Sequence, residues 1–408
     1  MTGSLIILAW RNIWRNKRRS LISMSSVLFA VLLAVLFYSM EKGSYDHMID
    51  NMVRYSTGYI QIQDVLFDEE PSMDNMLLYD DSVKDILNEM SDRLDWVPRI
   101  QGFTLAATDH ITRGAIVNGI DTAAEMVIND LEEDLIEGSF IDGTGNGVLL
   151  AEGLAGRLSV TIGDTVTLLS QGFRGATAAG LYPVMGILKL RIPELNSSAI
   201  YMSLDEARAF YMADERLTHL IIMPHNPSHT DQIASELRER LDSEWYAVYT
   251  WEYLMADLLR LMKFDIGGTI IFLLILYMII AFGLFGTILT MTIERMREFG
   301  MLMALGMKRK QIAFVSFTET LFLTFTGAVA GILVALPLVT YFHQNPIYLG
   351  DQMAAAMEDM GFEAVLPLSN APEIFLFQGL TVFAIAVIVG LYPLSKIMRT
   401  EIVQTKQP

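Results

Sequence analysis

Residues that could carry chemistry are sparse in this chain. The 408-residue sequence has no G-x-x-x-x-G-K-[ST] pattern and no Gly-Lys pair, so the phosphate-binding loop of a P-loop ATPase is absent. The lack of cysteine excludes disulfides, thiolate metal sites and cysteine nucleophiles. His225 and His229 are four residues apart, but Pro227 breaks the helix that would align two metal ligands. We therefore predict no catalytic, cofactor or metal site in this chain.

One acid interrupts an otherwise apolar segment. Glu319 is the only ionisable acid or base well inside the four apolar segments described below. Such residues usually face the interior of a helix bundle and mark a functional site, although a structural hydrogen bond to a neighbouring helix is an equal alternative. Gly327 and Gly331 follow as a G-x-x-x-G pattern, which lets helix backbones approach closely. We interpret the glycines as packing elements.

The elements that must hold these residues are membrane spans. Hydrophobic residues make up 52% of the chain and the mean hydropathy is +0.38, too high for an ordinary soluble protein. Crossing roughly 30 Å of hydrocarbon takes about 20 helical residues. Four segments qualify, namely 20–40, 266–292, 312–342 and 374–394. A basic, Trp-bearing stretch precedes the first and no A-x-A-like site follows it, which indicates a retained anchor.

Charges between the spans predict the orientation, because Lys and Arg accumulate on the cytoplasmic side. Residues 1–20 carry five basic groups and no acid, and the 293–311 loop carries five basic groups against two acids. By contrast, 41–265 has a net charge of -22, and 343–373 has five acids without Lys or Arg. We expect both termini inside and the acidic segments outside. The formal net charge of -18, segregated in this way, argues against nucleic-acid binding.

The large external segment predicts an α+β domain. Its acids show no paired motif, so a solvated face explains them better than a glycosidase-type dyad. Alternating or β-branched runs predict strands at 58–63, 115–120, 160–169, 184–190 and 217–223. Helices are expected at 81–94, 149–158, 203–212 and 230–241. Ser203 and Glu206 form a capping box at the start of the third of these helices.

The segment that leads into the second span has the pattern of a stalk. Residues 251–265 present one apolar helical stripe, and the first breaker is the Gly267 and Gly268 pair. A helix over 251–292 would be roughly 63 Å long, about twice the bilayer core, so we expect it to project beyond the membrane. The alternative is a separate surface helix that ends at the glycine pair.

Two segments on the cytoplasmic side are unusual for short flanks. Ile7–Ser20 combines Trp10 and Trp14 with bases on separate sides of a helix, as in helices that lie on anionic headgroups, although it also serves as positive-inside flanking. The 293–311 loop contains helix formers with Met301, Leu302 and Leu305 on an apolar face. It is either a surface-lying amphipathic helix or a plug that docks into a partner protein.

The whole arrangement resembles the permease subunits of type VII ABC transporters, which include the lipoprotein-releasing (Lol) permeases, the macrolide exporter MacB and the cell-division protein FtsX. The resemblance rests on the W-R-N-x-W-R-N-x-R-R entry and the E-R-x-R-E-F-G-x-x-x-A-L-G loop, and it covers the whole chain. Glu319 with the two glycines matches the family's third span. Tyr392, Pro393 and 396–403 resemble the family's ending, except that Ile402 replaces the usual proline.

The resemblance implies a multi-pass protein of the bacterial inner membrane. Its four spans would be 20–40, 266–292, 312–342 and 374–394. The other segments would be an amphipathic entry helix (1–20), a MacB-like periplasmic core (41–250), a stalk (251–265), a loop with the coupling helix (293–311), a periplasmic loop (343–373) and a cytoplasmic tail (395–408). It implies assembly with two copies of a separate ATPase, which hold ATP and Mg, and with a second permease, identical or homologous. ATP-driven closure of the ATPase pair would pass along the stalk to the external domain. We expect the chain alone not to hydrolyse ATP.

Several candidate sites follow from this resemblance. The ATPase would dock on Arg297, Glu298, Met301, Leu302, Leu305 and Gly306. A membrane-anchored cargo would leave the bilayer between the first two spans, past Phe37, Tyr38, Met40, Phe264, Ile271, Leu274 and Met278, where Met and aromatic side chains adapt to acyl chains. The Gly- and Ala-rich segment 170–183, with Gln171, Phe173, Arg174 and Tyr182, is the candidate loop for a periplasmic lipoprotein carrier or adaptor; the alternative is an ordinary long hairpin loop.

Two classes of function stay open on these grounds. The first is transport, most simply the extraction of lipoproteins or another amphiphile from the inner membrane, with MacB-like efflux as a variant. The second is FtsX-like signalling, in which the external domain moves to control a periplasmic partner and nothing is transported. An external segment of about 225 residues is much larger than that of FtsX-like regulators.

Overall fold

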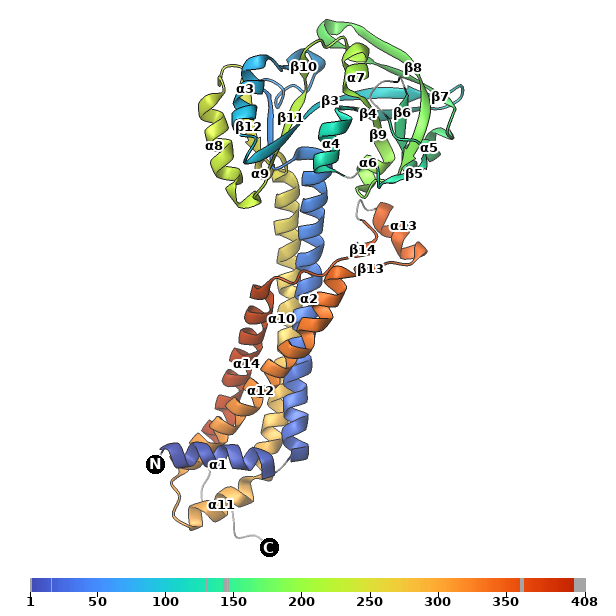
Figure 1. The fold of residues 1–408 in the computed structure, drawn as a ribbon. Helices are drawn as coiled ribbons and strands as arrows, with labels where there is room; N and C mark the ends of the chain where they lie inside the picture. Colours follow the sequence, from blue (N-terminus) through green and yellow to red (C-terminus); the bar gives the residue numbers. More distant parts are fainter. Residues whose placement is uncertain are drawn as a thin grey trace. The chain divides into compact units, whose positions relative to one another are not determined.

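The chain folds into two compact units. The computed structural model describes residues 2–15, 17–129, 131–141, 145, 147–359 and 363–399. The membrane unit comprises Met1–His47, Leu261–Tyr348 and Val365–Pro408, and the external unit comprises Met48–Arg260 and Leu349–Ala364 (Figure 1). Most of the predicted tail, 400–408, lies outside the described residues.

Among the residues that the structure describes, four helices are long and apolar enough to cross a membrane, which confirms the predicted number of spans. They are α2 (Lys17–Met52), α10 (Ala256–Glu294), α12 (Arg309–Gln344) and α14 (Pro372–Arg399), and two shorter helices, α1 (Thr2–Arg15) and α11 (Met296–Ala304), lie at their ends (Figure 1). The β-ladder β13 (Ile347–Tyr348) with β14 (Val365–Leu366) belongs to the same unit.

The stalk helix differs from its predicted limits at one end. The segment 251–292 is not one helix, because α9 (Trp251–Leu254) ends at Met255, whose φ of -101° and ψ of 21° leave the helical region. Helix α10 then continues through Gly267 and Gly268 to Glu294. A helix that ends at the glycine pair is therefore wrong, since glycine is tolerated inside membrane helices. At 1.5 Å per residue, its 39 residues extend about 58 Å.

Helix α2 packs into the membrane bundle through one apolar face. Its buried side chains Val27, Val31 and Val35 pack with Ala328 and Ala335 of α12, and with Val382 and Ala386 of α14. The two glycines of α12 make this packing close. A Cβ at Gly327 would lie 2.8 Å from the Met24 carbonyl oxygen, and one at Gly331 would lie 2.9 Å from the Leu28 carbonyl oxygen. The G-x-x-x-G pattern thus lies against the backbone of α2.

The external unit is built on one mixed sheet, which agrees with the predicted α+β class. The strand order is β12-β1-β11-β3-β4-β9-β6-β8-β5, with β7 pairing both β3 and β8. The strands are β1 (Ile60–Asp64), β3 (Leu94–Ala107), β4 (Thr112–Ile120), β5 (Leu135–Gly138), β6 (Val148–Ala151), β7 (Thr165–Gln171), β8 (Thr177–Leu188), β9 (Ala199–Ser203), β11 (His219–Pro224) and β12 (Tyr246–Thr250). Only β4 with β9 and β6 with β8 pair in parallel within this sheet.

Helices and short elements complete the external unit (Figure 1). The helices are α3 (Asp81–Glu89), α4 (Thr122–Ile128), α5 (Glu152–Leu158), α6 (Pro193–Ser198), α7 (Leu204–Tyr211), α8 (Thr230–Arg240) and α13 (Asp351–Asp359), and β2 (Leu77–Leu78) pairs with β10 (Arg216–Leu217). The Ser203 hydroxyl accepts a hydrogen bond from the Glu206 amide at 3.2 Å, which caps α7 as predicted.

Several elements of the external unit differ from the sequence predictions, and among those not predicted are β5, β9, β12, α4 and α6. The predicted helix 149–158 is β6 followed by α5, because a short buried apolar run fits either a strand or a helix. Strand β3, the longest, was not predicted at all. Pro98 and Gly102 interrupt its sequence, and both residues disfavour strands. Its pairing with β11, β4 and β7 overrides this local preference.

We predict that Gly327→Ala and Gly331→Ala lower the apparent melting temperature of the detergent-solubilised protein. Each new methyl group would overlap a carbonyl oxygen of α2, and overpacking of this kind costs about 1–3 kcal/mol. Gly267→Ala is the matched control, because a Cβ there has no atom within 4 Å. Equal melting temperatures for all three variants would show that α2 and α12 are not held this closely.

Candidate functional site

The cytoplasmic loop predicted at 293–311 contains a well-defined helix. Helix α11 ends in a Schellman motif, in which Gly306 N–H donates to the Met303 carbonyl at 3.0 Å and Met307 N–H donates to the Leu302 carbonyl at 3.1 Å. Gly306 has a φ of +95°, a left-handed conformation that glycine adopts without strain. The structural role of Gly306 is therefore to end the helix.

Helix α11 has apolar side chains on two faces, which corrects the single face predicted from sequence. Phe299 is buried and packs with Ile312 and Ala313 at the start of α12, and Leu302 packs against the same cluster. By contrast, Met301 is 64% exposed and Leu305 is 80% exposed. Leu302 thus belongs to the inner face. The outer face retains Met301 and Leu305 together with the exposed Arg297 and Glu298.

A buried ion pair fixes the beginning of α11. The guanidinium of Arg295, the residue between α10 and α11, donates to the carboxylate of Glu319 on α12, and both side chains are almost fully buried. Glu319 lies ten residues, or about 15 Å, into α12. In such surroundings a charge is stable only beside its counter-charge. The partner of the intramembrane acid is therefore a residue that sequence analysis counted among ordinary cytoplasmic bases.

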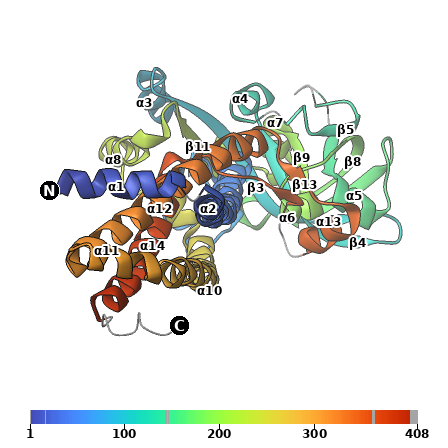
Figure 2. The same cartoon turned by 90° about the horizontal axis from the view of Figure 1, so that it is seen from below.

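Helix α1 braces the same region from the side (Figure 2). Arg15 forms an ion pair with Glu298 of α11 at 2.8 Å, and Asn12 lies beside the Glu319 carboxylate. The ring of Trp10 packs edge-on against Phe322 of α12 with centroids 5.5 Å apart. Trp14 stays largely exposed, so α1 has one face on the bundle and one that is free for headgroups. Helix α1 is therefore attached to both α11 and α12.

The predicted cargo path does not form a single surface in this chain. On α10, Phe264, Ile271, Leu274 and Met278 are all more than half exposed. On α2, Phe37 stacks on Phe272 of α10 with centroids 4.4 Å apart, but Tyr38 and Met40 pack against the bundle core. The structure thus groups the α10 residues on the outside of the bundle and separates Tyr38 and Met40 from them.

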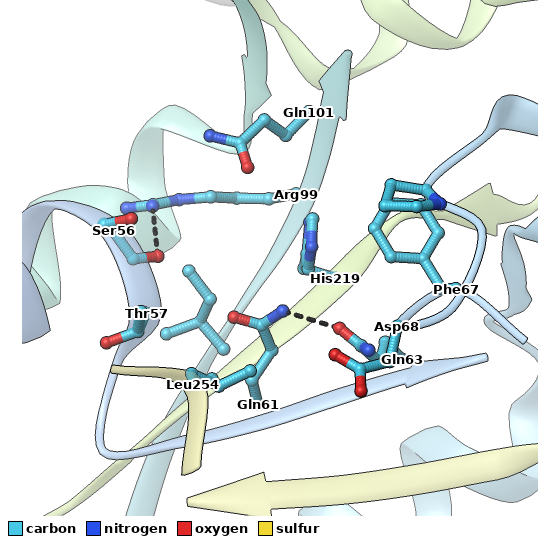
Figure 3. A pocket seen from close by; sticks show the side chains of 12 residues that line it. Ser56, Thr57, Gln61, Gln63, Phe67, Asp68, Arg99, Gln101, His219 and Leu254 are labelled. Carbon is cyan, nitrogen blue, oxygen red and sulfur yellow. Dashed lines mark hydrogen bonds between the residues drawn. The ribbon is translucent and has the colours of Figure 1, made fainter. Parts of the chain in front are cut away.

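In the external unit, both stalk helices meet the sheet at one polar joint. Helix α2 is followed by a π-helical turn, Val53–Thr57. Arg99 of β3 donates to the Tyr55 carbonyl at 3.0 Å and to the Ser56 carbonyl, drawn in Figure 3, at 3.3 Å. The same guanidinium forms a two-pronged, fully buried pair with Glu125 of α4. Trp251 N–H, at the start of α9, donates to the Tyr59 carbonyl at 3.0 Å. We call this set of contacts the stalk joint.

A small pocket of about 230 Å³ opens beside the stalk joint (Figure 3). Gln61, Gln63, Asp68 and His219 line it together with Arg99. Burial and then the nearby Arg99 charge hold the pKa of His219 below its usual range, so this ring stays neutral near neutral pH. The Arg99 donors are occupied by Glu125 and by backbone carbonyls, so the pocket offers no free cation for an anionic ligand. We therefore assign this polar cluster a structural role.

The segment 170–183 is a β-hairpin with a packed tip, which is the alternative kept open above. Strands β7 and β8 pair from Thr165 with Pro183 to Gln171 with Thr177, and a short 3-10 turn, Phe173–Gly175, joins them. The Arg216 guanidinium covers the Phe173 ring at 4.6 Å, and Tyr182 is buried against Phe210. Of the four proposed partner-loop residues, Gln171 and Arg174 are exposed and Tyr182 is not accessible.

We predict that Glu319→Leu lowers the melting temperature strongly and that Arg295→Met/Glu319→Leu restores it. The single change leaves a buried, unpaired guanidinium, which costs about 3–5 kcal/mol, whereas an apolar replacement of both partners is often neutral. Asp257→Asn is the control, since it breaks an ion pair with Arg260 whose side chains are 92% and 75% exposed. Additive losses in the double variant would contradict the pairing.

Comparisons with known proteins agree with this architecture. Residues 20–240 match the MacB-like periplasmic core domain, and residues 270–402 match the FtsX-like permease C-terminal family. The lipoprotein-releasing system transmembrane protein LolC of Neisseria meningitidis is 22% identical over 256 residues, which are 59% of this chain and 60% of that protein. The match thus spans less than two thirds of that relative's length.

Two solved structures are similar to the external part of the chain. The extracellular domain of the noncanonic ABC-type transporter YknZ from Gram-positive bacteria has a TM-score of 0.33 and 15% identity, covering 47% of this chain and 99% of that one. The periplasmic region of MacB from Actinobacillus actinomycetemcomitans has a TM-score of 0.35 and 12% identity, covering 51% and 95%. From the two family matches and the four spans, the chain is a multi-pass membrane protein that belongs to the FtsX/MacB-like permeases of ABC transporters.

Proposed function

We propose that this permease couples ATP hydrolysis by a separate ATPase subunit to movement of its external unit. Two ATPase copies, which bind ATP and Mg, would serve a pair of permeases, identical or homologous. The observation that carries the proposal is the outer face of α11, where Met301 and Leu305 expose 64% and 80% of their surface. Large apolar side chains beside charged ones, on a helix at the end of a membrane bundle, are typical of a protein contact.

The anchoring of α11 supports the same proposal. A helix that receives a force must be fixed to the parts it moves. Arg295 with Glu319, Phe299 with Ile312, and Arg15 with Glu298 attach α11 to α12 and α1. A headgroup-lying helix needs none of these contacts.

The continuity of the stalk helices supplies a route for the movement. Helix α10 has no break between Ala256 and Glu294, and α2 has none between Lys17 and Met52. Each is long enough to span the bilayer and to continue about 20 Å or more beyond it. The stalk joint then holds the carbonyl end of the first helix through Arg99.

We further propose that the cargo is a lipoprotein or another amphiphile of the bacterial inner membrane, and that both termini are cytoplasmic. The orientation rests on the basic ends and the acidic external segment. The proposal about the cargo is supported by the exposed apolar side of α10 and by the similarity to a lipoprotein-releasing protein. The contrasting function, signalling without transport, is an outcome of the second experiment below.

We predict that Met301→Asp and Leu305→Asp abolish pull-down of the ATPase subunit while the permease still inserts in the membrane. Burying such a side chain contributes about 1.5–3 kcal/mol, so a charge there should weaken the complex at least tenfold. Leu181→Asp in the external unit is the control, because Leu181 is 67% exposed and lies far along the chain from α11. An unchanged complex yield for both α11 variants would move the docking surface elsewhere.

We predict that photocrosslinkers at Ile271 and Met278 capture cargo in the nucleotide-free complex and lose it when ATP is added. Both side chains are more than half exposed on α10 and are long enough to contact an acyl chain. A crosslinker at Leu380 of α14, which is 63% exposed, is the control and should capture no cargo. Capture only at Leu380 would refute the path. No capture anywhere, with ATPase activity independent of added lipoprotein, would favour signalling.

A further inference from the structure

A large cavity lies at one end of the membrane unit, between the junction of α1 with α2 and the last turns of α10. Its volume is about 920 Å³. Arg15, Lys17 and Arg18 line it from the junction, and Gly283, Gly286 and Thr290 line it from α10. No atom lies within 4 Å of a Cβ built at either glycine, so the α10 wall is open along its length. The cavity therefore has a cationic end and a smooth helical wall.

The polar groups of the cavity differ in whether they already have a partner within the chain. The hydroxyl of Thr290 donates to its own helix at the Gly286 carbonyl, at 2.8 Å. Arg15 already pairs with Glu298, and Glu294, which also lines the cavity, makes an interaction of its own. Lys17 and Arg18 are both exposed at the first turn of α2. With Arg15 paired, Lys17 and Arg18 against the one lining carboxylate leave the cavity with a positive charge.

Apolar side chains complete the walls. Ile22 of α2 and Phe282 of α10 are 56% and 69% exposed and line the cavity on the side away from the cations. Both belong to membrane-spanning helices. An occupant must therefore carry negative charge at one end and be apolar beyond it, and it must come from the bilayer. A free anion such as phosphate satisfies only the first condition.

We propose that this cavity binds the headgroup of an anionic phospholipid, with Lys17 and Arg18 contacting the phosphate and the acyl chains lying along Ile22 and Phe282. Basic pockets between membrane helices bind anionic headgroups in this way, because the phosphate gains charge-assisted hydrogen bonds at the depth where it already resides. The inference does not depend on transport, on the ATPase or on the cargo.

A second copy of the chain fits the cavity less well than a lipid. In the membrane unit, the segment of α10 from Leu261 onward carries acids only at its ends, Asp265 and Glu294. At the level of Lys17 and Arg18 a neighbouring α10 could offer only its Glu294, which already makes an interaction within its own chain, so at least one of the two cations would stay uncompensated. Burial of unpaired cations is unfavourable. The charge of the cavity thus favours lipid over protein.

The test uses the full-length chain in lipid nanodiscs. Because the sequence has no cysteine, Thr290→Cys can carry a single fluorescent label in the cavity wall. Lipids brominated close to the headgroup quench such a label when they bind beside it. We expect brominated phosphatidylglycerol to quench at a roughly tenfold lower lipid fraction than brominated phosphatidylcholine, since two bases each favour an anionic headgroup.

Variants of the cations decide the assignment. K17Q/R18Q should remove the preference for phosphatidylglycerol, and K17R/R18K should keep it. K308Q/K310Q is the control, because it removes two exposed cations from the start of α12 that do not line the cavity. Equal quenching by the two lipids, or an equal loss of preference in K308Q/K310Q, would overturn the proposal.

Two further outcomes would identify a different occupant and overturn it as well. Displacement of the quenching lipid by millimolar inorganic phosphate would indicate a simple anion site. A disulfide between two unlabelled Thr290→Cys chains in the membrane would place a second copy in the cavity. Neither outcome affects the docking of the ATPase on α11, which is tested separately by pull-down.

Discussion

The ion pair between Arg295 and Glu319 is the contact on which the α11 end of the membrane unit depends. Two charges among apolar helices are tolerated only while they neutralise each other, so neither helix can move far without the other. Arg295 ends α10 and begins α11, and it is therefore the point where three helices are joined. The Phe299 cluster and the Arg15 contact with Glu298 add to this joint from two other sides. The outer face of α11 is consequently presented on a fixed base.

The sequence was sufficient to predict the spans and the presence of a helix in the 293–311 loop, because these follow from composition and from local periodicity. It was not sufficient to find the partner of Glu319. The two residues are 24 positions apart, and nothing in the sequence distinguishes Arg295 from the other bases of the same loop. Leu302 was assigned to the wrong face for a related reason. The period of a helix shows which residues share a side but not which side a neighbour covers.

In the external unit, too, local features could be predicted from the sequence and long-range contacts could not. Helices α7 and α8 and strands β1 and β4 could be predicted within a few residues. Strand β3 could not, since its proline and glycine oppose a strand locally and only its three partner strands stabilise it. The stalk joint was also missed. Arg99 has no motif around it, and its significance arises from the carbonyls of a turn more than 40 residues earlier in the chain.

The two stalk helices enter the external unit through unlike ends. The turn after α2 is held by one nitrogen of the buried Arg99 guanidinium, which donates to two carbonyls, whereas α10 is separated from α9 by a single non-helical residue, Met255. Two helical hydrogen bonds still cross that residue, from Met255 N–H to the Trp251 carbonyl and from Leu259 N–H to the Met255 carbonyl, both at 2.8 Å. In mechanical terms, both helices therefore end in the external unit as built-in struts rather than as hinged ones.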